Sequence, residues 1–132
     1  MKVVYEILPY IDDLMNLYKK EWWTNDRSKE EVIIMLKNTP ITIGLVENNK
    51  LIAFVRVLSD FVYKALIFDV IVDIKYRNKG ISKMLMQEIL NHFKLKNVKS
   101  FELYCKDEMK SYYEKFGFSK NELILMRREN VC

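Results

Sequence analysis

The pattern of hydrophobic and polar positions along this chain predicts alternating strands and helices. Helical spacing of apolar residues, with capping signals, predicts helices over residues 11–23, 28–38, 80–93 and 109–116. Runs rich in β-branched and aromatic residues predict strands over residues 3–8, 42–47, 51–59, 64–73, 100–105 and 122–127. Two local signals are specific: Ser28 and Glu31 form a capping box, and Asn48-Asn49 marks a hairpin turn.

The order of these elements, β-α-α-β-β-β-α-β-α-β, is that of an α/β fold with a mixed sheet flanked by helices. Residues 64–73 carry apolar side chains on both faces, so we expect this strand at the centre of the sheet. It should connect through a helix to strand 100–105 as a right-handed parallel crossover, which makes the sheet centrally parallel. With 132 residues there is room for one core, and we expect a single domain over residues 1–132.

The composition is that of an ordinary globular protein, with 50% hydrophobic and 30% charged residues. No apolar run reaches the ~20 residues that cross a bilayer. The N-terminal segment lacks the features of a signal peptide, so we expect no membrane partner and a cytoplasmic location. The net charge of +4 comes from scattered lysines, which does not favour a nucleic-acid partner. Cys105 and Cys132 are expected to be free thiols.

Scarce residue types exclude several kinds of chemistry. His92 is the only histidine, which argues against a metal site built on histidines. A Ser-His-Asp catalytic triad would have to use this one residue. We therefore expect no metal. Gly44, Gly80 and Gly117 are the only glycines, and their spacing fits neither a dinucleotide-binding loop nor a P-loop.

The segment from Arg77 to Ser82 lies between a predicted buried strand and an amphipathic helix. A helix N-terminus has unpaired backbone N–H groups and a partial positive charge, so it can hold a pyrophosphate. Gly80 has no Cβ to keep an anion away from these amides, and Arg77 and Lys79 add positive charge. An ordinary strand-to-helix turn with basic surface residues would have the same features, and this segment alone does not decide between the two.

Two motifs resemble those of the GCN5-related N-acetyltransferase (GNAT) family. IFDVIVDIKYRNKGISKMLM, residues 67–86, is similar to the family's acetyl-CoA-binding segment, and SYYEKFGF, residues 111–118, is similar to its F-Y-x-K-x-G-F element. The order and spacing of the elements agree with the family over nearly the whole chain. The sequence differs from the family pattern at Ile74, Asn78, Ser82 and Met109. None of these differences removes a charge or a required hydrogen-bond donor.

The resemblance implies that acetyl-CoA is the cosubstrate and assigns roles to individual residues. Tyr113 would hydrogen-bond or protonate the departing sulfur, and the backbone N–H of Val70 would polarise the thioester carbonyl. Independently of the resemblance, Asp69 interrupts a predicted buried strand and is a candidate catalytic base for the amine; the alternative is a structural acid that caps backbone amides or pairs with Arg56. The residues expected to bind acetyl-CoA are Val70, Val72, Arg77, Asn78, Lys79, Gly80, Ile81 and Ser82.

Trp22, Trp23 and Asp60 are the candidates for binding the acceptor, because aromatic rings and a carboxylate can receive an ammonium group. The expected function is transfer of an acetyl group from acetyl-CoA to a primary amine of a small molecule by direct attack in a ternary complex. Two alternatives stay open: a non-catalytic acyl-CoA-binding or interaction module, and a peptide or protein N-acetyltransferase. The sequence leaves the acceptor unidentified and a homodimer possible.

Overall fold

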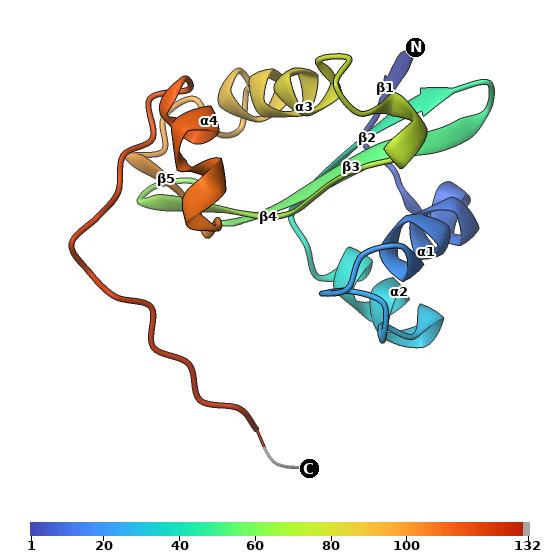
Figure 1. The fold of residues 1–132 in the computed structure, drawn as a ribbon, viewed down its shortest axis with the longest axis horizontal. Coiled ribbons are helices and arrows are strands. Elements are labelled where there is room, and N and C mark those ends of the chain that lie inside the picture. The colour runs from blue at the N-terminus through green and yellow to red at the C-terminus, as the bar shows by residue number, and fades with distance from the viewer. Residues whose placement is uncertain (131–132) are drawn as a thin grey trace.

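In a computed structural model of the chain, which describes residues 1–130, five strands form one mixed sheet (Figure 1). The strands lie side by side in chain order: β1 (Lys2–Val4), β2 (Ile41–Glu47), β3 (Lys50–Ser59), β4 (Lys64–Val72) and β5 (Ser100–Leu103). β1 to β4 pair antiparallel, whereas β5 is parallel to β4. The predicted α/β class and mixed sheet are confirmed.

Helices cover both faces of the sheet (Figure 1). α1 (Ile11–Lys19) and α2 (Lys29–Lys37) lie on one face, and α3 (Ile81–Leu90) and α4 (Lys110–Glu114) pack on the other. Short 3-10 turns precede α1, α3 and α4, namely η1 (Leu8–Tyr10), η2 (Ile74–Tyr76) and η3 (Asp107–Met109). No helix in the described part of the chain is long and apolar enough to cross a membrane.

The two layers of helices enclose two packed cores. The α3-side core is built around buried residues that include Ile43, Val55, Leu85 and Ile89. The α1-side core is built around buried residues that include Leu14, Tyr18, Phe54 and Ile71. Because each strand sends alternate side chains to opposite faces, β3 contributes to both cores and fixes the sheet between them.

The predicted local signals are found where the sequence places them. Ser28 caps α2, and its hydroxyl accepts a hydrogen bond from the Glu31 N–H at 3.2 Å. Asn48 and Asn49 form the two-residue turn between β2 and β3 with φ values of 54° and 62°. Asparagine tolerates this left-handed conformation better than most residues, which explains the tight hairpin.

Several predicted elements end earlier than expected, and the first strand and the first helix differ most, by about four residues each. The first strand ends at Val4 instead of residue 8, because the chain bends at Tyr5 and then forms a 3-10 turn at Leu8–Tyr10. The first helix ends at Lys19, so Trp22 and Trp23 lie in the loop that follows it. Within this loop, Thr24 is buried and donates a hydrogen bond to the Tyr18 carbonyl at 2.8 Å.

The prediction of a last strand over residues 122–127 is wrong for this structure. These residues belong to an extended, exposed segment that runs away from the sheet (Figure 1). β5 is therefore an edge strand, and the parallel β4–β5 pair lies at the edge of the sheet instead of at its centre. The hydrophobic pattern alone cannot make a strand, because a strand forms only where a neighbouring edge pairs with it.

Candidate functional site

β4 and β5 separate part-way along β4. Their pairing begins with Lys64 opposite Ser100 and ends with Ile67 opposite Leu103, where β5 stops. β4 continues to Val72 and remains paired with β3 on its other side. Residues 68–72 therefore have one backbone edge without a strand partner, and such an edge can bind an extended ligand through its N–H and C=O groups.

A β-bulge lies where the two strands separate. β3 has one residue, Val55, where β4 has two, Asp69 and Val70. Asp69 adopts a φ of 58°, which is uncommon for a residue with a side chain. The extra residue changes the alternation of β4, so that Ile67 packs in the α3-side core and Ile71 in the α1-side core. The bulge therefore lets β4 contribute side chains to both cores. It also leaves backbone N–H and C=O groups near Asp69 and Val70 outside the regular hydrogen-bond pattern of β3 and β4.

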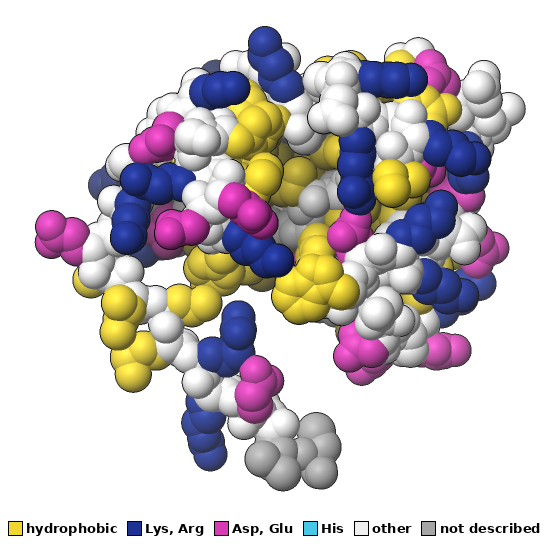
Figure 2. Space-filling model, viewed as in Figure 1, with side chains coloured by type: hydrophobic (Ala, Val, Ile, Leu, Met, Phe, Trp, Pro, Cys, Tyr) yellow, Lys and Arg dark blue, Asp and Glu magenta, His cyan; other side chains and the backbone are white. Residues whose placement is uncertain are grey.

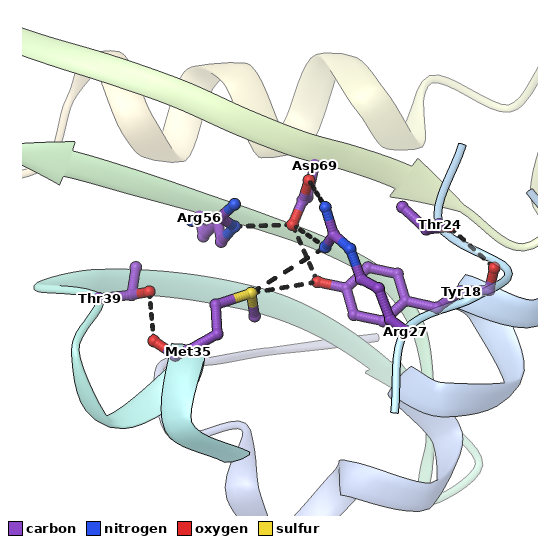
Figure 3. A network of polar contacts seen from close by, with 7 residues as sticks. All are labelled: Tyr18, Thr24, Arg27, Met35, Thr39, Arg56 and Asp69. Carbon is purple, nitrogen blue, oxygen red and sulfur yellow. Dashed lines mark hydrogen bonds and ion pairs between the residues drawn. The ribbon is translucent and has the colours of Figure 1, made fainter. Parts of the chain in front are cut away.

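The Asp69 carboxylate is the centre of a buried polar network (Figure 3). Its Oδ2 accepts hydrogen bonds from Arg56 Nε at 2.6 Å, Arg27 Nη1 at 2.7 Å and the Tyr18 hydroxyl at 3.0 Å. Its Oδ1 accepts a further hydrogen bond from Arg27 Nη2 at 3.3 Å. Burial by itself raises the pKa of Asp69, but the hydrogen bonds from Arg27 and Arg56 outweigh it and hold the pKa below its usual value.

This network favours a structural role for Asp69 over the role of general base. Its side chain is only 5% exposed, and both oxygens accept hydrogen bonds. A carboxylate with a lowered pKa is also a weaker base than an ordinary one. The partner considered from the sequence, Arg56, is present, and Tyr18 and Arg27 join it from α1 and the loop after it. Burial beside the carboxylate strongly raises the pKa of Tyr18, which keeps its hydroxyl protonated as a donor.

The first turn of α3 is open to an anion. Gly80 is the N-cap residue with a φ of 76°, and no side chain caps this end of the helix. The first helical hydrogen bond runs from the Met84 N–H to the Gly80 carbonyl at 3.1 Å, so the N–H groups of residues 81–83 lack partners within the helix. A Cβ added at Gly80 would meet no atom within 4 Å. Together, these features fit a bound pyrophosphate.

The basic side chains of this loop already have partners within the protein. Arg77 forms an ion pair with Glu21 from the loop between α1 and α2, and its Nε donates to the Val72 carbonyl at 3.2 Å. Lys79 Nζ lies 5.5 Å from the centroid of the Tyr76 ring. The pair of Arg77 with Glu21 connects the expected acetyl-CoA loop to the region expected to bind the acceptor.

Ser82 and Tyr112 connect the first turn of α3 to α4. Their hydroxyl groups lie 2.5 Å apart, and the Tyr112 ring packs edge-on against the Tyr113 ring at 5.2 Å between centroids. Tyr113 is half-buried, and burial raises its pKa to about 12. Its hydroxyl therefore remains protonated at neutral pH and can donate a hydrogen bond. Ser82, which stands where the family usually has glycine or alanine, thus helps to position the helix that carries Tyr113.

The candidate acceptor residues lie in different surroundings. Trp22 is 71% exposed, and Lys106 Nζ lies 4.9 Å from its ring centroid, so the ring already receives an ammonium group from the segment after β5. Trp23, in the same loop, is 39% exposed.

Asp60 lies in the turn before β4 and acts there as a backbone cap. Its Oδ1 accepts hydrogen bonds from the N–H groups of Val62, Tyr63 and Lys64, and these bonds lower its pKa. Asp60 precedes the first residue of β4, whereas Trp22 contacts Lys106, which follows the last residue of the parallel strand β5. Asp60 and Trp22 therefore lie toward opposite ends of these strands.

The face shown in Figure 2 is hollowed near its middle, with hydrophobic side chains on the floor and charged side chains on the rim. In the same view, Figure 1 shows β4 crossing this region, with α4 to one side of it. A separate cavity of about 800 Å³, whose lining includes Tyr5, His92 and Phe93, lies at the C-terminal end of α3, opposite Gly80. The lining of this cavity includes neither the bulge residues of β4 nor the first turn of α3.

Residues 8–118 match the Acetyltransferase (GNAT) family. The chain belongs to this family. It is 29% identical over 117 residues to the uncharacterized N-acetyltransferase ycf52 of Pyropia yezoensis, which covers 81% of this chain and 67% of that protein. It is 26% identical over 93 residues to GCN5-related N-acetyltransferase 1, chloroplastic, of Arabidopsis thaliana, covering 70% of this chain and 47% of that protein. The chain thus spans between about two thirds and half of the length of these two relatives.

A solved structure agrees with this assignment. A GNAT-family protein from Xanthomonas campestris pv. campestris has a TM-score of 0.81 and 26% sequence identity, covering 98% of this chain and 94% of that chain. The chain is therefore an acetyl-CoA-dependent N-acetyltransferase of the GNAT family.

Several residues that contact this GNAT site were not identified from the sequence, and Tyr18, Glu21 and Lys106 are examples. In the sequence, Tyr18 fits the apolar spacing of the first helix, and nothing indicates that its hydroxyl donates to the buried Asp69 carboxylate. Glu21 and Lys106 look like ordinary surface charges. Their partners, Arg77 and Trp22, lie far away in the chain, so no local motif reports these contacts.

Because Asp69 holds this network together, we expect Asp69→Asn to lower the stability of the protein. Loss of the charge leaves Arg27 and Arg56 partly buried and unpaired, which should lower the free energy of unfolding by about 3 kcal/mol or more. The lowered pKa means that ionised Asp69 stabilises the fold above the unfolded pKa of about 3.9, and this contribution is lost as the pH falls through the folded pKa. The difference in thermal unfolding between the two proteins should therefore begin to shrink below about pH 4 and disappear only below the lowered pKa of folded Asp69.

Asp12→Asn is the matched control, because it removes an exposed carboxylate from an ion pair with Lys29 and should cost at most about 1 kcal/mol. In the same comparison, the pH dependence of kcat/KM should keep its shape in Asp69→Asn. A mutant that is as stable as wild type but recovers activity only at high pH would restore the role of general base.

The pair of Arg77 with Glu21 predicts that Glu21→Gln binds CoA more tightly. Glu21 competes with a phosphate for the Arg77 guanidinium, and an exposed pair of this kind contributes up to about 1 kcal/mol, or roughly fivefold in Kd. Calorimetry with CoA measures the effect, with Glu30→Gln on α2 as a control of equal charge. The gain should vanish in an Arg77→Ala background, and unchanged affinity in Glu21→Gln would contradict the competition.

Proposed function

We propose that this GNAT transfers the acetyl group to the primary amine of a small molecule by direct attack in a ternary complex. The observation that carries the proposal is the free backbone edge of β4 at residues 68–72. Val70, Val72 and Tyr113 all pack against the α3-side core, so this edge and the tyrosine belong to the same side of the sheet as the open turn of α3. The cytoplasmic location expected from the sequence stays a prediction.

Acetyl-CoA would be held by backbone groups more than by side chains. The unpaired N–H groups of residues 81–83 and the charges of Arg77 and Lys79 suit the pyrophosphate. The free edge of β4 suits the amides of the pantetheine arm, because an extended chain pairs with a strand edge through main-chain hydrogen bonds. Asn78, with a φ of 63°, and Gly80 let the loop turn tightly into α3.

In the proposed reaction the amine nitrogen attacks the thioester carbonyl carbon, a C–N bond forms, and the C–S bond breaks. The backbone N–H of Val70, one of the two bulge residues, would donate to the oxygen that becomes negative. Tyr113 would donate a hydrogen bond to the departing thiolate. Since a thiol has a pKa of about 8.5, complete proton transfer from a phenol with a pKa of about 12 is unfavourable, and the hydrogen bond is the better role.

The amine must lose a proton before it attacks, and Asp69 is engaged elsewhere. A primary amine with a pKa of ~10 is almost wholly protonated at neutral pH, so water would remove the proton and the rate would rise with pH. The exposed Trp22 ring is the proposed contact for the acceptor. It already receives the Lys106 ammonium, and a cationic acceptor of small size can take the same position.

Tyr113→Phe tests the catalytic role of the phenol. The hydrogen bond to sulfur strengthens only as the thiolate forms, so kcat should fall by about 10²-fold while the Kd for CoA stays within about twofold. Tyr104→Phe is the matched control, because it removes an exposed hydroxyl near β5 and keeps the ring that packs against Phe68. Wild-type kcat in Tyr113→Phe would remove this residue from the mechanism.

Gly80→Ala tests the pyrophosphate site, and Gly117→Ala controls for backbone strain. Both glycines have positive φ, of 76° and 90°, and an added Cβ meets no atom within 4 Å at either position. Both variants should therefore lose similar stability, about 1–2 kcal/mol. Only Gly80→Ala should weaken CoA binding, by roughly tenfold or more, since its Cβ enters the space over the helix amides. Equal weakening in both variants would contradict the site.

Turnover separates the proposed function from its alternatives. Release of free thiol from acetyl-CoA should be saturable in at least one small primary amine, and mass spectrometry should find the acetylated amine. Saturable CoA binding without thiol release on any amine or peptide would favour a non-catalytic binding module. Acetylation of peptides but not of small amines would favour a protein N-acetyltransferase.

A further inference from the structure

Arg56 uses only part of its guanidinium group on Asp69. Its Nε donates to Asp69 Oδ2 at 2.6 Å, whereas its two Nη nitrogens have no hydrogen-bond acceptor within residues 1–130. In that part of the chain no buried side-chain nitrogen or oxygen lacks a partner, so both Nη nitrogens of Arg56 are in contact with solvent. Arg27 differs, because both of its Nη nitrogens donate to the same carboxylate (Figure 3). The planar Nη pair of Arg56 is therefore free to bind a ligand.

The free end of Arg56 lies near the expected reaction centre. Its Cζ is 5.1 Å from the centroid of the Phe68 ring, and Phe68 is the first residue of the β4 stretch that has no β5 partner. The covalent bonds from Val70 N to Asp69 Oδ2, together with the hydrogen bond from Arg56, keep Arg56 Nε within about 10 Å of the Val70 nitrogen. One small molecule can therefore contact Arg56 and also reach a thioester carbonyl held by Val70.

The charges of the network around Asp69 do not balance. Asp69 contributes one negative charge, whereas Arg27 and Arg56 contribute two positive charges, which leaves a net charge of +1. Tyr18 adds no negative charge, because its strongly raised pKa keeps the phenol protonated. The Arg56 side chain is only 16% exposed, so water hydrates this excess charge poorly. An anion bound to Arg56 would compensate it.

We propose that the acceptor is an amine that also carries a carboxylate, and that the Nη pair of Arg56 binds this carboxylate. The inference rests on the proposed function, because it names the class of acceptor for the same site. A guanidinium group binds a carboxylate through two parallel N–H···O hydrogen bonds, which fix the orientation of the ligand as well as its position. The bound carboxylate neutralises the network, and the amine end of the acceptor then faces the thioester carbonyl beside Val70. Arg56 is thus a specificity-determining residue that selects amino acids over simple amines.

Pairs of amines that differ only in the carboxylate test this selection. Tyrosine with tyramine is one pair, and β-alanine with ethylamine is another. The ratio of kcat/KM for the acid to kcat/KM for the simple amine, measured by thiol release from acetyl-CoA, should be at least tenfold in one pair or both. Arg56→Gln removes the Nη pair and should lower this ratio at least tenfold. Because both amines are measured on the same protein, the ratio does not depend on the fraction of enzyme that is folded.

Arg27→Gln is the matched control for Arg56→Gln. Each variant leaves Asp69 with one guanidinium partner, so both should lose stability, but only Arg56 has an unused Nη pair. The ratio should therefore stay within about threefold of wild type in Arg27→Gln. No preference for the acid in either pair of amines, an unchanged ratio in Arg56→Gln, or an equal fall in both variants would overturn the proposal.

Binding of the acetylated products tests the same site without turnover. In calorimetry on the CoA-saturated protein, N-acetyltyrosine should bind at least tenfold more tightly than N-acetyltyramine. Arg56→Lys, which keeps a cation beside Asp69 but has no planar Nη pair, should remove most of this difference. This preference without thiol release on any amine would refute the proposed function and keep the carboxylate site. Thiol release together with equal binding of the two products would refute the carboxylate site and keep the proposed function.

Discussion

The Asp69 carboxylate, held by two guanidinium groups and a phenol, fixes the middle of β4. Asp69 has a left-handed φ, which costs on the order of 1–3 kcal/mol and persists only where its surroundings hold it in place. Arg56 holds it from the neighbouring strand, and Tyr18 and Arg27 hold it from α1 and the loop after it. The same contacts therefore fasten the α1–α2 layer to the sheet. They also keep the bulge, which frees backbone groups near Val70 at the point where β5 departs.

From this fixed point, two polar contacts tie the expected acetyl-CoA loop to its surroundings. Arg77 pairs with Glu21, in the loop that carries Trp22 and Trp23, so a phosphate bound at Arg77 would compete with this carboxylate. Ser82 is joined to Tyr112, next to the tyrosine expected to act on the sulfur. These two contacts link the expected acetyl-CoA loop to the loop after α1 and to α4.

The sequence was sufficient for the fold because its strongest signals are local. The capping box at Ser28, the hairpin at Asn48-Asn49 and the amphipathic helix after Gly80 all report geometry within a few residues. The glycine loop and the Tyr112-Tyr113 element were identified as site elements through their resemblance to family motifs. The strand at residues 122–127 was predicted wrongly because pairing depends on a partner edge, which a pattern of apolar residues does not supply.

The role of Asp69 was left open from the sequence for a related reason. Strand alternation alone does not give the direction of its side chain, because a bulge changes the alternation and nothing in the chain near Asp69 indicates the bulge. Arg56 was visible as a partner because it lies in the adjacent strand. Tyr18 and Arg27 arrive from an element that is distant in sequence and could only be placed once α1 was packed against β4.

The most direct test of this account is a crystal structure of the protein with a non-hydrolysable thioether analogue of acetyl-CoA. The account predicts the carbonyl oxygen of the analogue about 2.9 Å from the Val70 nitrogen, the pyrophosphate on the N–H groups of residues 81–83, and Asp69 still bound to Arg27 and Arg56. An analogue bound in the cavity beside His92 and Phe93 would contradict it. So would a Val70 N–H paired within the sheet.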